Sequence, residues 1–325
     1  MNDSLFTLDN RLPADYVDGA LRADVLHGLG STPLTLPSKW LYDSYGSELF
    51  EQITLLPEYY PTRAEREILS RRAPEIAAYS QAATLLELGA GFSRKTQLLL
   101  NALIARGTLL RYAPLDISAT ALTEGAADIR AQYPGLRVAA TVADFESGLD
   151  VSDSPGPRLL AFLGSTIGNF DADERRAFYR TLSFALSPED VLLLGVDLVK
   201  DPQILIRAYD DDAGVTAAFN KNVLRVLNNR LGADFDISAF DHVARWDADH
   251  ERIEMRLRAR TRQTVKIPDP GLTVDFAAGQ DLRTEISCKF RPESLADELA
   301  EGGFAVRHLW TDHVGQCAVV MASRA

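Results

Sequence analysis

A glycine-containing turn between a predicted strand and a predicted helix is the first feature of this sequence that could bind a ligand. The apolar run TLLEL, residues 84–88, leads into Gly89-Ala90-Gly91, and a segment with helical apolar spacing starts at Lys95. A strand, a tight turn and a helix in this order can bind phosphates, dinucleotides or adenosyl groups. The turn alone therefore leaves the ligand open.

Two phosphate-binding patterns fit this turn poorly. A dinucleotide fingerprint that begins at Gly89 requires a third glycine at position 94, where the sequence has Arg94. The Walker A pattern matches at Gly89, Lys95 and Thr96, but Arg94 again replaces its second glycine. An ATPase with Asp197 as its Walker B acid is the less favoured alternative.

Acidic residues at the ends of the next two predicted strands favour an adenosyl ligand. Asp116 ends the second strand, where a carboxylate can accept hydrogen bonds from both hydroxyls of a ribose. Asp144 and Phe145 follow the third strand, where the carboxylate can accept the adenine amine and the ring can stack on the base. Together with the glycine turn, they predict S-adenosylmethionine; loop caps are the alternative interpretation of the two acids.

The elements that must hold these residues alternate between strand and helix from Thr84 to Asp197. Strands are predicted in TLLEL, LRYAPLD, LRVAATVAD, RLLAFLGS and VLLLGVD, and helices from Lys95, Ser118 and Asp171. Nearly continuous apolar strands that alternate with helices indicate a parallel sheet covered on both faces. Such sheets bind ligands at the carboxyl ends of their strands.

After Asp197 the pattern changes. A helix is predicted in residues 211–231, and the period-two alternation of residues 242–265 predicts a two-stranded antiparallel hairpin with one exposed face. The sheet pattern then returns, with a predicted helix in PESLADELAEGG and predicted strands in FAVRHLWTD and QCAVVMAS. We therefore expect a sheet domain that is interrupted by an inserted subdomain.

Composition limits the partners. The formal net charge of -12 opposes nucleic-acid binding, and no apolar run is long enough to span a membrane. Cys288 and Cys317 form no CxxC pair and are expected to be reduced and buried, and the histidines lack metal-ligand spacing. We expect a cytoplasmic monomer that acts on a small molecule and binds no metal.

Four motifs, LELGAGFSRKT, PLDIS, ADF and FLGSTIGNF, together resemble the class I methyltransferases. The similarity is specifically to the histidine-specific N-alpha-methyltransferases of ergothioneine biosynthesis, which form hercynine, and it continues through segments such as TEISCKFRPE over nearly the whole chain. It implies an α/β fold: a Rossmann-like sheet with an inserted second α+β substrate domain. The implied domains are 63–198 with 290–325 for S-adenosylmethionine, and 17–62 with 199–289 for the substrate.

The resemblance also implies the site residues. The cofactor would be bound by Gly89, Lys95, Asp116, Asp144, Phe145 and Gly164, and S-adenosylhomocysteine would be the product. Histidine would be bound by Tyr59, Asn169, Tyr209, Met255, Glu285 and Ser287, with Tyr42 as the catalytic residue that orients the amine and passes its proton towards solvent.

The pair Glu285 and Ser287 suits an imidazole, because residues two apart on an extended segment share a face and can bond both ring nitrogens. A solvated strand face is the alternative interpretation of this pair, as core packing is for the tyrosines. A methyltransferase for another small amino acid or amine remains the alternative function.

Overall fold

The computed structural model describes residues 5–91, 95–146 and 148–325, so Arg94, on which the two phosphate patterns failed, lies outside the described residues. The chain falls into two compact units. Unit 1 consists of Met1–Leu12, Pro61–Val199 and Lys289–Ala325, and unit 2 consists of Pro13–Tyr60 and Lys200–Cys288.

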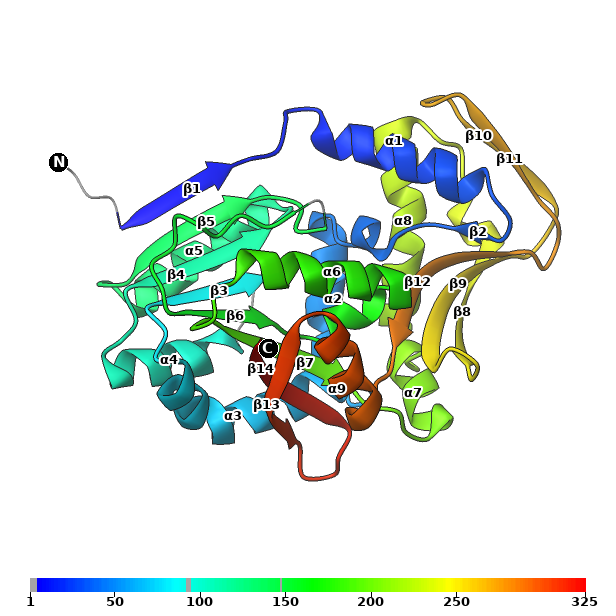
Figure 1. Cartoon of the computed structure of the whole chain (residues 1–325). Coiled ribbons are helices and arrows are strands. Elements are labelled where there is room, and N and C mark those ends of the chain that lie inside the picture. The colour runs from blue at the N-terminus through cyan, green and yellow to red at the C-terminus, as the bar shows by residue number, and fades with distance from the viewer. Residues whose placement is uncertain (1–4, 92–94, 147) are drawn as a thin grey trace. The chain divides into compact units, whose positions relative to one another are not determined.

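Unit 1 is built on a mostly parallel sheet, as the alternation of strands and helices predicts (Figure 1). Among the described residues its order is β1-β5-β4-β3-β6-β7-β14-β13, and β14 is the strand that runs in the direction opposite to the others. The strands are β1 (Phe6–Asn10), β3 (Thr84–Leu88), β4 (Arg111–Asp116), β5 (Arg137–Val142), β6 (Arg158–Phe162), β7 (Val191–Asp197), β13 (Phe304–Thr311) and β14 (Cys317–Arg324).

Local sequence signals explain the ends of several helices in unit 1. The Ser118 side chain accepts the Ala121 N–H at the start of α5, and Asp171 forms a capping box with Glu174 at the start of α6. The helices of this unit are α3 (Pro61–Ser80), α4 (Thr96–Arg106), α5 (Ala119–Gln132), α6 (Ala172–Ala185) and α9 (Pro292–Glu301), with a 3₁₀ turn η2 (Thr166–Asn169).

The strand order creates a binding edge at the middle of the sheet. The chain leaves β3 towards β4 and β5 on one side and later adds β6 and β7 on the other side. Ligands bind outside the carboxyl ends of the strands where the order reverses in this way. The turn after β3 and the loop after β6 flank this point because the two strands are paired.

Unit 2 is an α+β unit, as expected for an inserted substrate domain. Its main sheet has the order β2-β12-β9-β8, and β10 and β11 form a separate hairpin. The helix α8 packs against α2, β8 and β9. The elements are α1 (Tyr16–Leu29), β2 (Leu34–Thr35), η1 (Ser38–Leu41), α2 (Ser44–Leu55), α7 (Pro202–Tyr209), α8 (Val215–Leu231), η3 (Ile237–Ala239), β8 (Phe240–Asp247), β9 (Arg252–Ala259), β10 (Gln263–Ile267), β11 (Leu272–Phe276) and β12 (Asp281–Cys288).

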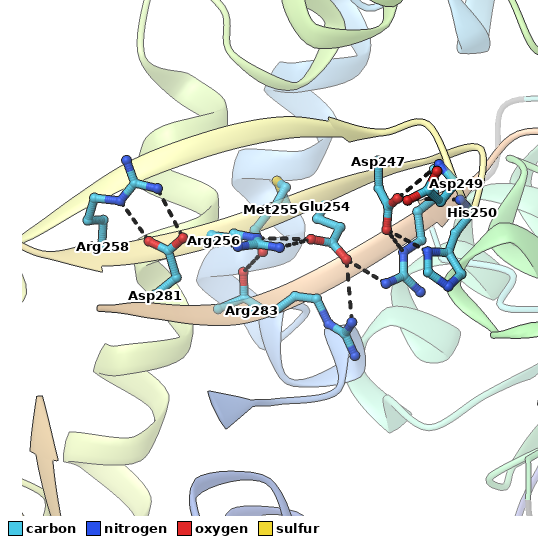
Figure 2. A network of polar contacts seen from close by, with 11 residues as sticks. Asp247, Asp249, His250, Glu254, Met255, Arg256, Arg258, Asp281 and Arg283 are labelled. Carbon is cyan, nitrogen blue, oxygen red and sulfur yellow. Dashed lines mark hydrogen bonds and ion pairs between the residues drawn. The ribbon is translucent and has the colours of Figure 1, made fainter. Parts of the chain in front are cut away.

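The predicted antiparallel hairpin is confirmed by the pairing of β8 with β9, but it is not limited to two strands, because the sheet continues through β12 to β2. The prediction that one face of the hairpin is exposed is wrong in part. On that face Glu254 is only 2% exposed and forms ion pairs with Arg252 and Arg256 (Figure 2). Pairing with β12 depends on residues far along the chain, which alternation within the hairpin cannot reveal.

In the part of the chain that the structure describes, no helix combines the length and the apolar character that crossing a membrane requires.

Candidate active site

The turn after β3 has a backbone conformation that explains why it contains two glycines. Gly89 and Gly91 have φ angles of +63° and +45°, a region that favours glycine. A side-chain carbon at Gly89 would meet no described atom within 4 Å, so the turn borders open space. The Gly91 N–H donates to Asp116 Oδ2 at 3.3 Å. The acid at the end of β4 therefore lies against the turn.

Asp116 is a partly buried carboxylate with a second bond to the backbone of its own loop, since its Oδ1 accepts the Ser118 N–H at 2.9 Å. Burial raises the pKa of Asp116, although the backbone hydrogen bonds from Ser118 and Gly91 act in the opposite direction. A carboxylate offers about four acceptor positions, and three backbone N–H groups, of Gly91, Ile117 and Ser118, act on this one, so it can accept a further bond from a ligand hydroxyl. Asp116 thus both holds the turn and is available to a ligand.

Lys95, just past the turn, is paired with Glu65 from α3. Glu65 is 4% exposed, and its other oxygen accepts the Gly164 N–H at 2.7 Å, at the end of β6. One buried carboxylate therefore connects the two loops that flank the binding edge. Sequence reasoning missed Glu65, although it shares a helix face with the buried Ala64 and Ile68, where a charged residue is unusual.

Asp144 and Phe145 follow β5. Asp144 is 9% exposed, and its Oδ1 accepts the Glu146 N–H at 2.9 Å. The Phe145 ring makes an edge contact with Phe162 at 5.4 Å between centroids and a tilted contact with Phe178 at 5.9 Å. These contacts hold the ring at the end of the strand, and the ring is only partly buried.

In unit 2 the predicted tyrosines form one aromatic cluster. The Tyr42 ring lies 5.1 Å from Phe219 and 5.4 Å from Phe50, and Phe50 lies 6.1 Å from Tyr59. The Tyr59 ring in turn lies 6.4 Å from Tyr209. Three tyrosines are thus brought together: Tyr42 from between η1 and α2, Tyr59 from the loop after α2, and Tyr209 from the end of α7.

The predicted imidazole pair adjoins this cluster. Glu285 and Ser287 on β12 pair with Met255 and Ile253 on β9, so these side chains share one face of the sheet. The Ser287 Oγ lies 2.7 Å from the Tyr209 hydroxyl, and Glu285 is 8% exposed. The structure therefore brings together five of the six predicted substrate residues and the predicted catalytic residue Tyr42 within unit 2. The sixth, Asn169, ends η2 in unit 1.

Burial and the nearby charge of Glu285 raise the pKa of Tyr42 well above its ordinary value. Its hydroxyl therefore stays protonated at neutral pH. In this form Tyr42 can accept or donate a hydrogen bond, but it supplies no phenolate base.

One group of possible metal ligands occurs among the described residues, in unit 1. Glu67, Asp312 and His313 place ligand atoms within 4.8 Å of one another. Asp312 accepts hydrogen bonds from the backbone N–H groups of Gln316 and Cys317, and Glu67 accepts one from the Nδ1–H of His313 at 2.7 Å. These hydrogen bonds explain why the three side chains lie close together.

Comparison with known proteins identifies relatives of this chain. A family model described as histidine-specific methyltransferase, SAM-dependent, matches residues 21–324. The histidine N-alpha-methyltransferase of Mycolicibacterium smegmatis is 53% identical and covers 98% of this chain and 99% of its own length. Ergothioneine biosynthesis protein 1 of Neurospora crassa is 36% identical over 62% of this chain and 23% of that protein.

Among solved structures, an S-adenosylmethionine-dependent methyltransferase from Clostridium acetobutylicum matches 87% of this chain and 100% of that chain, with 13% identity and a TM-score of 0.50. This match concerns the fold alone. It confirms the predicted Rossmann-like class.

Proposed function

The chain belongs to the family of histidine-specific, S-adenosylmethionine-dependent methyltransferases, and from this premise we propose that it methylates the alpha-amino nitrogen of L-histidine three times. The product is hercynine, an intermediate of ergothioneine biosynthesis, the pathway named by the fungal relative. The observation that carries the proposal is the polar pair Glu285 and Ser287 on one face of β12, beside the hydroxyl of Tyr209.

The residues of unit 1 fit S-adenosylmethionine. The turn at Gly89 borders open space, and Asp116, which lies against the turn, can accept a ribose hydroxyl. Asp144 suits the adenine amine. Lys95 uses one of its three N–H donors for Glu65 and keeps others for a ligand carboxylate. Bound S-adenosylmethionine would supply an activated methyl group: the amine nitrogen would bond to the methyl carbon as the carbon–sulfur bond breaks, and S-adenosylhomocysteine would leave with the sulfur.

The residues of unit 2 are assigned the alignment of the amine, which must be neutral to react. Efficient transfer requires a lone pair about 3 to 3.5 Å from the methyl carbon. A free alpha-amino group has a pKa of about 7.7 to 8.0, so part of it is neutral at pH 7 and water can take the proton. Tyr42, whose raised pKa keeps it protonated, orients the amine and relays its proton towards solvent.

We assign uncharged side chains to the carboxylate of histidine, and a carboxylate together with a hydroxyl to its imidazole ring. Tyr59, Tyr209 and Asn169 offer uncharged donors for the carboxylate, and aromatic faces suit a product with a trimethylammonium group. Glu285 accepts the imidazole N–H, and Ser287 donates to the other nitrogen. Met255, opposite Glu285, packs against the ring.

The protein is proposed to act in the cytoplasm, a reducing compartment in which the buried thiols of Cys288 and Cys317 would stay reduced. We propose that it acts as a monomer on a small-molecule substrate.

Mass spectrometry of histidine incubated with S-adenosylmethionine and the protein tests this function. We expect histidine to gain three methyl groups. Parallel reactions with phenylalanine, tryptophan and small amines test the alternative substrates, and binding of ATP with magnesium tests the ATPase alternative. Unmodified histidine beside a methylated alternative amine would reject the assignment.

A further inference from the structure

Three buried polar side chains lie behind the proposed substrate residues of unit 2. Asn220 from α8 and Thr284 from β12 are fully buried, and the His242 side chain on β8 is 3% exposed. None of them belongs to the contacts proposed for histidine. Burying such groups costs free energy, and apolar residues of the same shape would hold the sheet on α8 equally well. Stability alone therefore does not account for them.

Asn220 determines the tautomer of His242. Its amide nitrogen donates to His242 Nδ1 at 2.8 Å and to the Arg256 carbonyl at 3.1 Å. Because Nδ1 accepts, the ring proton lies on Nε2, which donates to the Tyr209 carbonyl at 2.8 Å. His242 thus fixes the backbone of the residue whose hydroxyl bonds Ser287.

Thr284 connects the same amide to a β-bulge. The Thr284 hydroxyl lies within hydrogen-bond distance of Asn220 Oδ1 and, at 3.1 Å, of the Met255 carbonyl. Arg283 pairs with Arg256 on β9, whereas Glu285 pairs with the adjacent Met255, so Thr284 is the extra residue.

This bulge decides which way Glu285 points. Arg283 and Asp281 face the outer, charged side of the sheet, where Asp281 pairs with Arg256 and Arg258 (Figure 2). In an unbroken strand Glu285 would follow them, since residues two apart share a face. The extra residue shifts the alternation by one and turns Glu285 and Ser287 to the side of Met255.

We propose that Asn220, His242 and Thr284 are positioning residues for histidine recognition. They hold the bulge that directs Glu285 and Ser287 inwards, and they fix Tyr209 against Ser287. The inference rests on the proposed function, because it assigns to this network the geometry of the imidazole-binding side chains.

The test compares His242→Phe, which removes both ring nitrogens, with His242→Gln, which keeps a donor towards the Tyr209 carbonyl, and with Thr284→Val, which removes only the hydroxyl. His250→Phe is the matched control, because it makes the same chemical change at an exposed position of the same hairpin. For each protein one measures the melting temperature, histidine and S-adenosylhomocysteine binding by calorimetry, and kcat and KM for histidine.

We expect His242→Phe and Thr284→Val to weaken histidine binding and raise its KM by about tenfold, the loss of one hydrogen bond's free energy, with S-adenosylhomocysteine binding unchanged. His242→Gln should recover much of the loss, and His250→Phe should match the parent. Variants that melt earlier or have a lower kcat, but bind histidine like the parent, would show a merely structural network and overturn the inference. If His242→Phe does not fold, Thr284→Val and His242→Gln decide.

The parent protein separates this inference from the proposed function. A parent that leaves histidine unmethylated rejects the function itself. A parent that methylates histidine, with variants of unchanged KM, rejects the positioning role alone.

Discussion

The surroundings of the Tyr42 hydroxyl limit the chemistry that this side chain can perform. Burial and the charge of Glu285 raise its pKa, so ionisation of the phenol is unfavourable throughout the neutral range. A general base with that pKa would be nearly unpopulated. The hydroxyl can still orient the amine lone pair, and a phenylalanine at this position would keep the ring contacts with Phe50 and Phe219.

Tyr42→Phe should therefore lower kcat far more than it weakens histidine binding, because orientation of the amine matters most in the transition state. The comparison of kcat with the calorimetric dissociation constant for histidine checks this. Equal losses in both quantities would indicate that Tyr42 serves packing alone.

Asp116→Ala should weaken S-adenosylmethionine binding by roughly 1.5 to 3 kcal/mol, the contribution of hydrogen bonds to a charged group. The melting temperature should fall as well, since the Gly91 N–H loses its acceptor. Calorimetry with S-adenosylmethionine measures the effect, and histidine binding serves as the control. A folded variant with unchanged cofactor affinity would disprove the ribose assignment.

Glu285→Ala should weaken histidine binding by roughly 1 to 3 kcal/mol, because the imidazole N–H loses its acceptor in a buried place. Discrimination against apolar rings should fall with it, since the remaining site no longer leaves a carboxylate unpaired. The ratio of kcat/KM for histidine to that for tryptophan measures the change. Asp281→Ala, on the same strand but on the outer face, is the matched control and should keep the parent ratio.

Among the elements, those specified by neighbouring residues could be predicted from the sequence. Seven consecutive buried residues form β7, and the caps at Ser118 and Asp171 begin α5 and α6 where the helical spacing begins. The strand β1 escaped prediction because its partner, β5, lies about 130 residues further on. Register and pairing over such distances leave no local pattern.

The candidate site shows the same limit. The two-residue spacing predicts that Glu285 and Ser287 share a face, but it does not say which face. The bulge at Thr284 decides this, and its partner Asn220 lies in a different element. The sequence around His242 does not reveal its role either, because its two partners, Asn220 and the Tyr209 carbonyl, come from α8 and α7.

On α3, Glu65 provides a test of how an element supports the binding edge. Glu65→Gln would leave Lys95 without its ionic partner in a largely buried place, and we expect a loss of about 3 kcal/mol in stability. S-adenosylmethionine binding should weaken too, because Gly164 loses part of its support. Glu67→Gln, two residues along the helix and partly exposed, is the control and should have a smaller effect. Equal melting temperatures for the two variants would contradict this.

Across the whole molecule, several buried carboxylates are stabilised in their charged form. Hydrogen bonds and ion pairs outweigh the effect of burial and lower the pKa of Asp190, Glu254 and Asp281. A carboxyl whose pKa is lower in the folded state adds stability above its unfolded pKa, of about 3.9 for Asp and 4.3 for Glu, and this is lost as the pH falls through the folded value. The protein should therefore lose stability on acidification below about pH 4.5.

Asp190 offers the sharpest test of this acid sensitivity. Its side chain is fully buried between β6 and β7 and accepts bonds from the Arg158 side chain, at 2.7 Å, and from the Ser187 N–H. Burial alone would raise its pKa, but these donors lower it, so Asp190→Asn should melt earlier at pH 7 and lose less further stability between pH 4.5 and pH 2. Asp128→Asn, at an exposed position of α5, should follow the parent curve. Melting temperatures measured across this pH range compare the slopes, and parallel curves for Asp190→Asn and the parent would show that Asp190 does not contribute to the acid transition.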